Sequence, residues 1–260
     1  MGIETATRSV SQVEQYEKCP YRFYLRRVVR IPPRPAAWSI QGTAFHAACE
    51  AYERSERVMT CEEVADVYSE TYTDLTRAAL SRTPDTEHWL RAKGEGTQDI
   101  EDRYALGVAQ TRAYVEWALG RESGIWRDSR GVPAIELHLT APLGGVIVQG
   151  YIDQLTTDEA GALNVRDLKT GTTRSKFQLA TYGALVRAAL GEEVNRGDWY
   201  MAKTGKPSRA VDISEGAGHK VSEKFRAMDE GVKRGDFPAK AGFECRFCDV
   251  SHACSSNRYR

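Results

Sequence analysis

The fold is decided by residues 144–171, which read GGVIVQGYIDQLTTDEAGALNVRDLKTG. Residues 144–155 are β-rich and predict one strand. A turn follows at Asp158–Gly161, and residues 162–168 predict the next strand. These two strands form the centre of the predicted core, and the chemistry of the sequence gathers at their ends.

Acidic residues stand at the ends of both strands. Asp153 ends the first, and Asp167 and Lys169 end the second. Because side chains alternate along a strand, Asp167 and Lys169 point to the same side, and pairing of the strands would bring Asp153 to Asp167. Two such carboxylates, with a backbone carbonyl and waters, form an oxygen-rich site for Mg²⁺ or Mn²⁺. A lysine beside it can stabilise negative charge at phosphorus. A structural salt bridge at the strand end is the alternative interpretation.

The segments on either side add strands and helices to this pair. The other predicted strands are Ala134–Thr140, Trp199–Ala202 and Ala210–Ile213. The predicted helices are Ser9–Val29, Gln41–Arg57, Cys61–Ser81, Asp99–Gly120, Phe177–Leu190 and Val221–Lys233. Three strands, a helix and further strands predict an α/β core with a mixed sheet, preceded by a mostly helical first half.

Four motifs follow one another along the chain. They are Gly42-Thr43-Ala44-Phe45-His46, Gly150-Tyr151-Ile152-Asp153, Asp167-Leu168-Lys169-Thr170-Gly171 and Gln178-Leu179-Ala180-Thr181-Tyr182. An acidic-x-Lys triplet alone is weak, because about one or two arise by chance in a chain of this length. The ordered set is specific, and it resembles the RecB-like branch of the PD-(D/E)XK nucleases. The resemblance implies a restriction-endonuclease-like core, in which helices flank a mixed central sheet.

The same resemblance implies roles for individual residues. The expected metal ligands are His46, Asp153, Asp167 and, on the preceding strand, Glu136. The expected catalytic residues are Asp153, Asp167, Lys169, Gln178 and Tyr182. Gln178 and Tyr182 lie four residues apart on one helical face, which by resemblance borders the site and contacts DNA or the lysine. Taken singly, His46 would be an ordinary helix histidine, Glu136 a solvent-facing strand residue, and the Gln178–Tyr182 pair a semi-buried polar contact.

Four cysteines predict a second site, of a different chemical kind. They are Cys19, near the start, and the C-terminal set Cys245, Cys248 and Cys254. Four thiolates complete either a zinc site or an iron–sulfur cluster. The arrangement resembles the iron–sulfur members of the RecB-like group, including the AddB nuclease domain and the CRISPR-associated adaptation exonucleases, which implies a [4Fe–4S] cluster that joins both termini. Zinc is the alternative, with His252 as a ligand in place of Cys19. Cys49 and Cys61 lack partner spacing and are predicted to be buried small hydrophobic residues.

Bulk properties exclude some classes of protein and leave others open. The 260 residues carry 36 basic and 36 acidic side chains, so the net charge of zero gives no support to nucleic-acid binding. Locally, arginines between Arg22 and Arg34 lie among aromatic residues, a pattern that suits phosphate and base contacts or, alternatively, a solvated helix face. We expect no membrane span and no signal peptide, and therefore a cytoplasmic protein with reduced thiols that favour metal binding over disulfides.

The sequence therefore predicts one integrated domain made of three segments. These are a helical region at 1–125, a nuclease core at 126–240 and a cysteine segment at 241–260. The predicted function is a metal-dependent DNA exonuclease for single strands or DNA ends, in recombination or repair, phage DNA metabolism or CRISPR adaptation. Alternatives are a flap or fork endonuclease, a non-catalytic DNA-binding iron–sulfur scaffold, and a zinc-stabilised adaptor. Because no Gly-x4-Gly-Lys-Ser/Thr loop is present, an associated helicase or recombination protein would be a separate chain.

Overall fold

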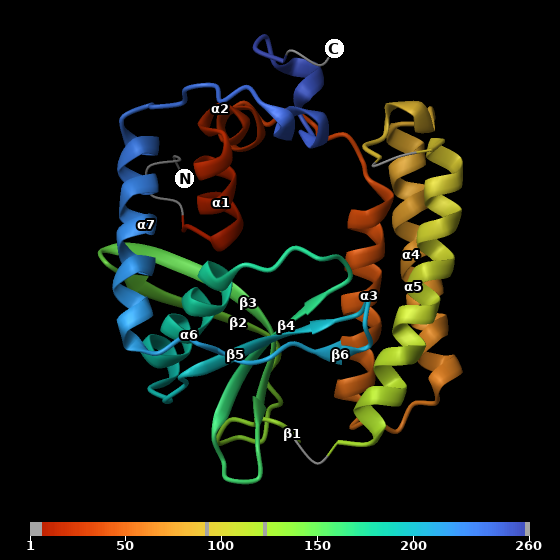
Figure 1. The fold of residues 1–260 in the computed structure, drawn as a ribbon, viewed down its shortest axis with the longest axis vertical. Helices are drawn as coiled ribbons and strands as arrows, with labels where there is room; N and C mark the ends of the chain where they lie inside the picture. Colours follow the sequence, from red (N-terminus) through yellow and green to blue (C-terminus); the bar gives the residue numbers. More distant parts are fainter. Residues whose placement is uncertain (1–6, 92–93, 122–123, 258–260) are drawn as a thin grey trace.

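The computed structural model describes residues 7–91, 94–121 and 124–257, in which helices lie on both faces of a mixed sheet (Figure 1). The helices are α1 (Val10–Lys18), α2 (Pro20–Phe23), η1 (Tyr24–Val28), α3 (Ala37–Arg54), α4 (Cys61–Arg82), η2 (Thr86–His88), α5 (Gly96–Leu119), α6 (Lys176–Leu190), α7 (Glu215–Lys233), η3 (Phe243–Phe247) and η4 (Ser251–Ala253). The strands are β1 (Gly124–Ile125), β2 (Ile135–Leu143), β3 (Val146–Thr157), β4 (Leu163–Lys169), β5 (Arg196–Met201), β6 (Lys206–Pro207) and β7 (Val211–Asp212).

The sheet is built around β3, its longest strand. β1 and β2 both pair with one edge of β3, and β4 pairs antiparallel with the other edge. β4 then runs parallel to β5, and helix α6 makes the crossover between them. The short strands β6 and β7 both pair antiparallel with β5. The predicted α/β core with a mixed sheet is confirmed.

One hydrophobic core lies between the sheet and a layer formed by α1, α6 and α7. Helix α6 is buried along most of its length because its sequence is rich in Leu, Ala and Val. It also approaches β3 closely at Gly150, where a Cβ atom would lie 3.0 Å from the Tyr182 ring and 2.9 Å from Leu185. Gly150, the first residue of the second motif, therefore allows α6 to bring Tyr182 against the sheet.

A second core joins α3, α4 and α5 to the ends of β4 and β5. Leu168 from β4 and Tyr200 from β5 are buried in it, and Tyr200 stacks on Phe45 of α3 with ring centroids 6.4 Å apart. Helix α4 begins after a reciprocal cap, in which Glu63 N–H donates to Thr60 Oγ1 and Thr60 N–H donates to Glu63. The helical first half is thus packed directly on the strands that carry the third motif.

The predicted single helix at Ser9–Val29 is wrong. Helix α1 ends at Lys18, and Cys19 has extended backbone angles, φ −160° and ψ 103°. The physical reason is Pro20, because proline disfavours a helical conformation in the residue before it. The chain resumes as α2 and then forms the π-helical turn η1. Cys19 therefore lies between α1 and α2 and not within a helix.

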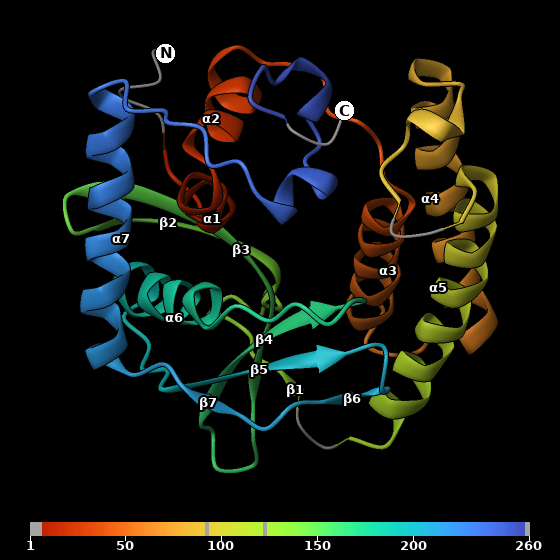
Figure 2. The ribbon, with the colours of Figure 1, turned by 45° about the horizontal axis from the view of Figure 1, so that its top comes forward.

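The two ends of the chain meet on one side of the molecule. Figures 1 and 2 show α1 and α2 beside the C-terminal segment that carries η3 and η4. Arg34 N–H donates to Asp249 O at 2.8 Å, and Arg8 forms a 2.7 Å ion pair with Asp229 on α7. None of the helices in the described ranges is long and apolar enough to cross a bilayer.

Candidate active site

Acidic residues on three neighbouring strands occupy matching positions across the sheet. In the β2–β3 pair, Ile135 lies opposite Gln154 and Leu137 opposite Ile152, which leaves Glu136 opposite Asp153. In the β3–β4 pair, Gln154 lies opposite Arg166, so the next step along both strands brings Asp153 opposite Asp167. The sequence prediction that these two aspartates meet follows from this register.

Glu136 occupies an irregular position in β2. Its φ of 46° lies in the left-handed region, which is costly for a residue with a Cβ atom, by about 1–3 kcal/mol. Arg54 of α3 donates to the neighbouring Ile135 carbonyl at 3.0 Å and fixes the strand beside this point. The local irregularity interrupts the β2–β3 pairing and leaves the Glu136 carboxylate half-buried, facing His46.

The strands β3 and β4 separate where the aspartates stand. There the Leu168 N–H donates to Asp153 Oδ2 at 2.6 Å, so the buried carboxylate takes the place of a backbone carbonyl as the hydrogen-bond acceptor. The Leu168 carbonyl lies 3.0 Å from His46 Nε2. This contact fixes the orientation of the imidazole, so that Nδ1 faces the carboxylates.

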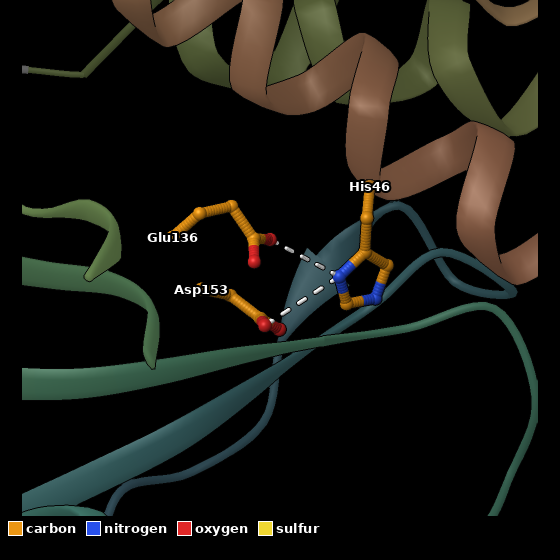
Figure 3. A group of neighbouring side chains, drawn as sticks. All are labelled: His46, Glu136 and Asp153. Atoms are coloured by element: carbon orange, nitrogen blue, oxygen red, sulfur yellow. Dashed lines mark ion pairs between the residues drawn. The ribbon is translucent and has the colours of Figure 1, made fainter. Parts of the chain in front are cut away.

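Helix α3 carries His46 to the two acidic side chains. Its Nδ1 atom lies 3.5 Å from both Glu136 Oε1 and Asp153 Oδ1, and the three side chains converge on one point (Figure 3). Their ligand atoms all lie within 4.8 Å of one another. Burial alone would lower the pKa of His46, but the charge and hydrogen bonds of the neighbouring carboxylates outweigh it and raise the pKa well above its usual value. The group therefore favours a cation at this position.

Asp167 lies beside this trio and not within it. Lys169 Nζ lies 2.8 Å from Asp167 Oδ2 and forms an ion pair with this buried carboxylate. Burial and the charge of Asp153 raise the pKa of Asp167 to about 7. The Asp167 carboxylate therefore holds Lys169 at the end of β4, next to the His46–Glu136–Asp153 group.

The fourth motif holds the lysine from the other side. Lys169 Nζ donates to Gln178 Oε1 at 3.0 Å, and Gln178 Nε2 donates to the Tyr182 hydroxyl at 3.0 Å. Ser175 caps α6, because Gln178 N–H donates to its hydroxyl at 3.1 Å. Burial raises the pKa of Tyr182, so that its hydroxyl stays protonated. The side chains of all seven predicted site residues are thus found in one continuous cluster.

The ligand types fit Mg²⁺ or Mn²⁺. The imidazole of His46 and the carboxylates of Glu136 and Asp153 provide nitrogen and oxygen donors of the kind these ions bind, and the Asp167 carboxylate lies beside them. The lysine at the edge of this cluster would face a phosphoryl group held there. Such an arrangement suits hydrolysis of a phosphate ester.

The comparison with known proteins decides the family. The sequence profile of the PD-(D/E)XK nuclease superfamily matches residues 7–255. The chain belongs to this superfamily. The nuclease is 37% identical to the gene 69 protein of Mycobacterium phage D29, with 97% of each chain covered, and 34% identical to the gene 69 protein of Mycobacterium phage L5, with 95% of each covered. A crystal structure of an exonuclease candidate from Eubacterium rectale also aligns with this chain. The alignment covers 99% of this chain and 91% of the other, at 13% sequence identity and with a TM-score of 0.49.

His138 lies apart from the candidate active-site cluster. It faces Tyr151 across the β2–β3 pair, and the two rings stack with centroids 4.6 Å apart on an exposed surface. Glu136 and His138 are two residues apart on β2, but the backbone is irregular at Glu136. Of these two side chains, only that of Glu136 faces His46.

The four predicted cysteines of the nuclease line one cavity between the two chain ends. Its lining includes Cys19, Cys245, Cys248 and Cys254, together with the basic residues Lys18, Arg22 and Lys240. Lys240 N–H donates to Cys19 Sγ and Gly242 N–H donates to Cys245 Sγ, each at 3.4 Å. Converging sulfurs, backbone donors and positive charge fit a metal group held by thiolates. His252 is exposed and outside this lining.

The remaining two cysteines differ from each other. Cys49 is fully buried in the α3–α5 core, as predicted. Cys61 is only half-buried, because it is the first residue of α4 and lies at the edge of that core. The prediction of a buried Cys61 is therefore wrong in degree, although neither thiol reaches the cavity.

Part of the basic stretch has an internal partner. Arg22 and Arg26 each contact Asp249 at 2.8 Å, beside Cys248. Two of the arginines proposed from the sequence to follow phosphates thus also fasten the cysteine segment. Arg27 and Arg30 are exposed on the same turn.

Proposed function

We propose that this nuclease is a metal-dependent DNA exonuclease acting on single strands or DNA ends. The observation that supports the proposal is the joint placement of the His46–Glu136–Asp153 group and the Asp167–Lys169 pair at the point where β3 and β4 separate. In this proposal, the residues that hold Mg²⁺ or Mn²⁺ are His46, Asp153, Asp167 and Glu136.

The reaction is hydrolysis of a phosphodiester bond. A water oxygen forms a bond to phosphorus, the bond from phosphorus to the departing strand breaks, and the proton balance is completed by solvent. When bound, the divalent ion lowers the pKa of its water and polarises the phosphoryl oxygens. Lys169 orients the attacking water and stabilises the negative charge that develops at phosphorus. Gln178 and Tyr182 position Lys169 through the hydrogen bonds described above.

The biological setting we propose is phage DNA metabolism. The two relatives named above are mycobacteriophage proteins that this chain matches over almost its whole length. Recombination, repair and CRISPR adaptation use the same chemistry, and any helicase or recombination partner would be a separate protein. A flap or fork endonuclease is the second candidate, because the same catalytic groups serve either mode of cleavage.

We further propose that the cysteine cavity holds a [4Fe–4S] cluster. The support is the convergence of four thiols from both chain ends, with basic side chains that would balance the charge of a thiolate cluster. Its role would be structural: it would tie the N-terminal helical region, through Cys19, to the C-terminal cysteine segment 241–260. Protein purified without air should be brown and contain about four irons per chain, whereas colourless protein with stoichiometric zinc would contradict the cluster.

One experiment separates the exonuclease from the endonuclease. End-labelled linear DNA and closed circular DNA, each single- and double-stranded, are incubated with Mg²⁺ or Mn²⁺. We expect linear strands to be degraded from their ends and closed circles to persist. Rapid linearisation of closed single-stranded circles would favour the endonuclease, and no cleavage of any substrate would contradict the catalytic proposal.

A further inference from the structure

The loops that follow β4 and β5 border a cavity of about 580 Å³ that the proposed reaction does not use. Lys169 ends β4 and lies opposite Met201, which ends the parallel strand β5. The turns Thr170–Thr172 and Ala202–Gly205 follow these strands and form one wall, and α5 forms the other. In α/β proteins, ligands bind outside the carboxyl ends of parallel strands. Thr170, which lines the cavity, directly follows Lys169 in the chain, and its hydroxyl lies beside Gly42 of the helix that carries His46.

The cavity has two chemically different walls. The loop wall carries the hydroxyl groups of Thr170 and Thr172 and the uncrowded turn at Gly171, whereas the Thr204 hydroxyl donates to the Met201 carbonyl at 3.2 Å. The α5 wall is mostly apolar, with Leu106, Ala109 and Ala113. A nucleotide has the matching division, because its phosphate is polar and charged while its sugar and base present apolar faces.

The charge of the lining is positive. The charged residues among those that line the cavity are Arg103 and Lys203. Arg103 is already engaged, since it donates to Asp99 at 3.3 Å and to Gln41 at 3.2 Å. Lys203 is exposed and, within the ranges that the structure describes, forms no ion pair. Lys203 is therefore the cation that can turn to an incoming anion.

The loop wall is also held in place. Gln110 on α5 donates from Nε2 to the Thr170 carbonyl at 3.3 Å, and Gln41 on α3 donates to Gln110 at 2.7 Å. Ala202 N–H donates to the Lys169 carbonyl at 2.8 Å. These contacts tie the turn after Lys169 to the helix that carries His46, so that a ligand in the cavity would be aligned with the catalytic groups.

We propose that this cavity binds a backbone phosphate of the substrate strand, next to the phosphate that is hydrolysed, with Lys203 and the threonine hydroxyls as its contacts. The proposal rests on the nuclease function proposed above and names part of its substrate path. The α5 wall would contact the adjoining sugar or base. Because the neighbouring phosphate is bound separately, this subsite contributes to substrate affinity and not to the chemical step.

The test compares Lys203→Gln with Lys206→Gln, which makes the same charge change on the same hairpin outside the cavity lining. Cleavage of an end-labelled single strand is measured over a range of salt concentrations. Lys203→Gln should raise KM several-fold with kcat unchanged and should lower the slope of log affinity against log salt by about 0.7, the value for one phosphate contact on a single strand. Lys206→Gln should match the wild type.

A neutral methylphosphonate linkage, moved one position at a time along the strand, locates the contact. In the wild type, one position beside the cleavage point should raise KM, and in Lys203→Gln that sensitivity should disappear. An active wild type with the same methylphosphonate pattern as Lys203→Gln would overturn the phosphate subsite and leave the nuclease function intact. A wild type that cleaves no strand would overturn the nuclease function itself, and with it the subsite.

Discussion

The two clusters of metal-type ligands differ in how the chain holds them. The oxygen and nitrogen ligands stand on β2, β3, β4 and α3, where backbone register and two hydrophobic cores fix their positions. The thiols stand on an extended residue between α1 and α2 and in or beside the short turns η3 and η4. We infer that the catalytic cluster forms without its metal, whereas the cysteine cavity depends on the group it binds.

The two sites should therefore respond differently when the metal group that each binds is removed. Removal of divalent ions by a chelator should stop cleavage and leave the sheet folded. Loss of the thiol-bound group should release the chain ends, because the binding energy of such a site is also folding energy. Four predictions test the comparison.

The largest effect is expected at the catalytic lysine. Lys169→Ala should reduce the cleavage rate about 10²-fold or more, because it removes the charge that stabilises the transition state. The variant should still fold, with a lower melting temperature, because it leaves the buried Asp167 carboxylate without its cation. Steady-state cleavage and thermal unfolding of the same preparation measure both quantities. Cleavage at the wild-type rate would remove Lys169 from the mechanism.

The cysteine site should show the opposite pattern. Cys248→Ser should lose most of the bound iron and lower the melting temperature, and residual cleavage should fall only as far as the folded fraction falls. Absorbance, iron content and thermal unfolding provide the measurements. Cys49→Ser is unsuitable as a control because Cys49 is buried in the core. Cys61→Ser, at a half-buried position at the start of α4, is the matched control and should retain the colour. A Cys248→Ser protein with full iron content would exclude this residue as a ligand.

The third prediction is that the ionised Asp167 carboxylate lowers the stability of the folded protein. Its pKa of about 7 means that folding disfavours the ionised carboxylate beside Asp153. Asp167→Asn should therefore abolish cleavage and yet raise the melting temperature of the chelator-treated protein, by about 2–4 °C for each kcal/mol gained. Differential scanning calorimetry at neutral pH measures the change. A lower melting temperature in Asp167→Asn would show that its contact with Lys169 outweighs the cost of burying its charge.

The smallest effects concern the arginines near the cysteine cavity. Arg26→Ala removes a contact to Asp249 and should destabilise the protein by about 1 kcal/mol or less. Arg30→Ala should leave stability unchanged and, if Arg30 contacts DNA, reduce the salt dependence of binding by at most one phosphate contact. Chemical denaturation and binding to labelled single strands at several salt concentrations separate the two. Equal effects of both variants on stability would remove the distinction between a fastening and an exposed arginine.

The sequence by itself determined the order and chemistry of the parts. Alternation along residues 144–171 predicted the central strands, and the motifs that end in His46, Asp153 and Lys169 predicted the catalytic cluster. The four cysteines predicted a shared site. These features depend on local periodicity and residue type, which act over a few positions along the chain. They were therefore visible before any packing was known.

Only the tertiary structure decided how these parts meet. It brought His46 to Asp153, placed the Leu168 carbonyl against His46 Nε2, and paired Arg26 with Asp249. Each of these contacts joins two residues that are more than 100 positions apart in the chain. Such contacts arise from sheet register and helix packing, which no local sequence pattern specifies.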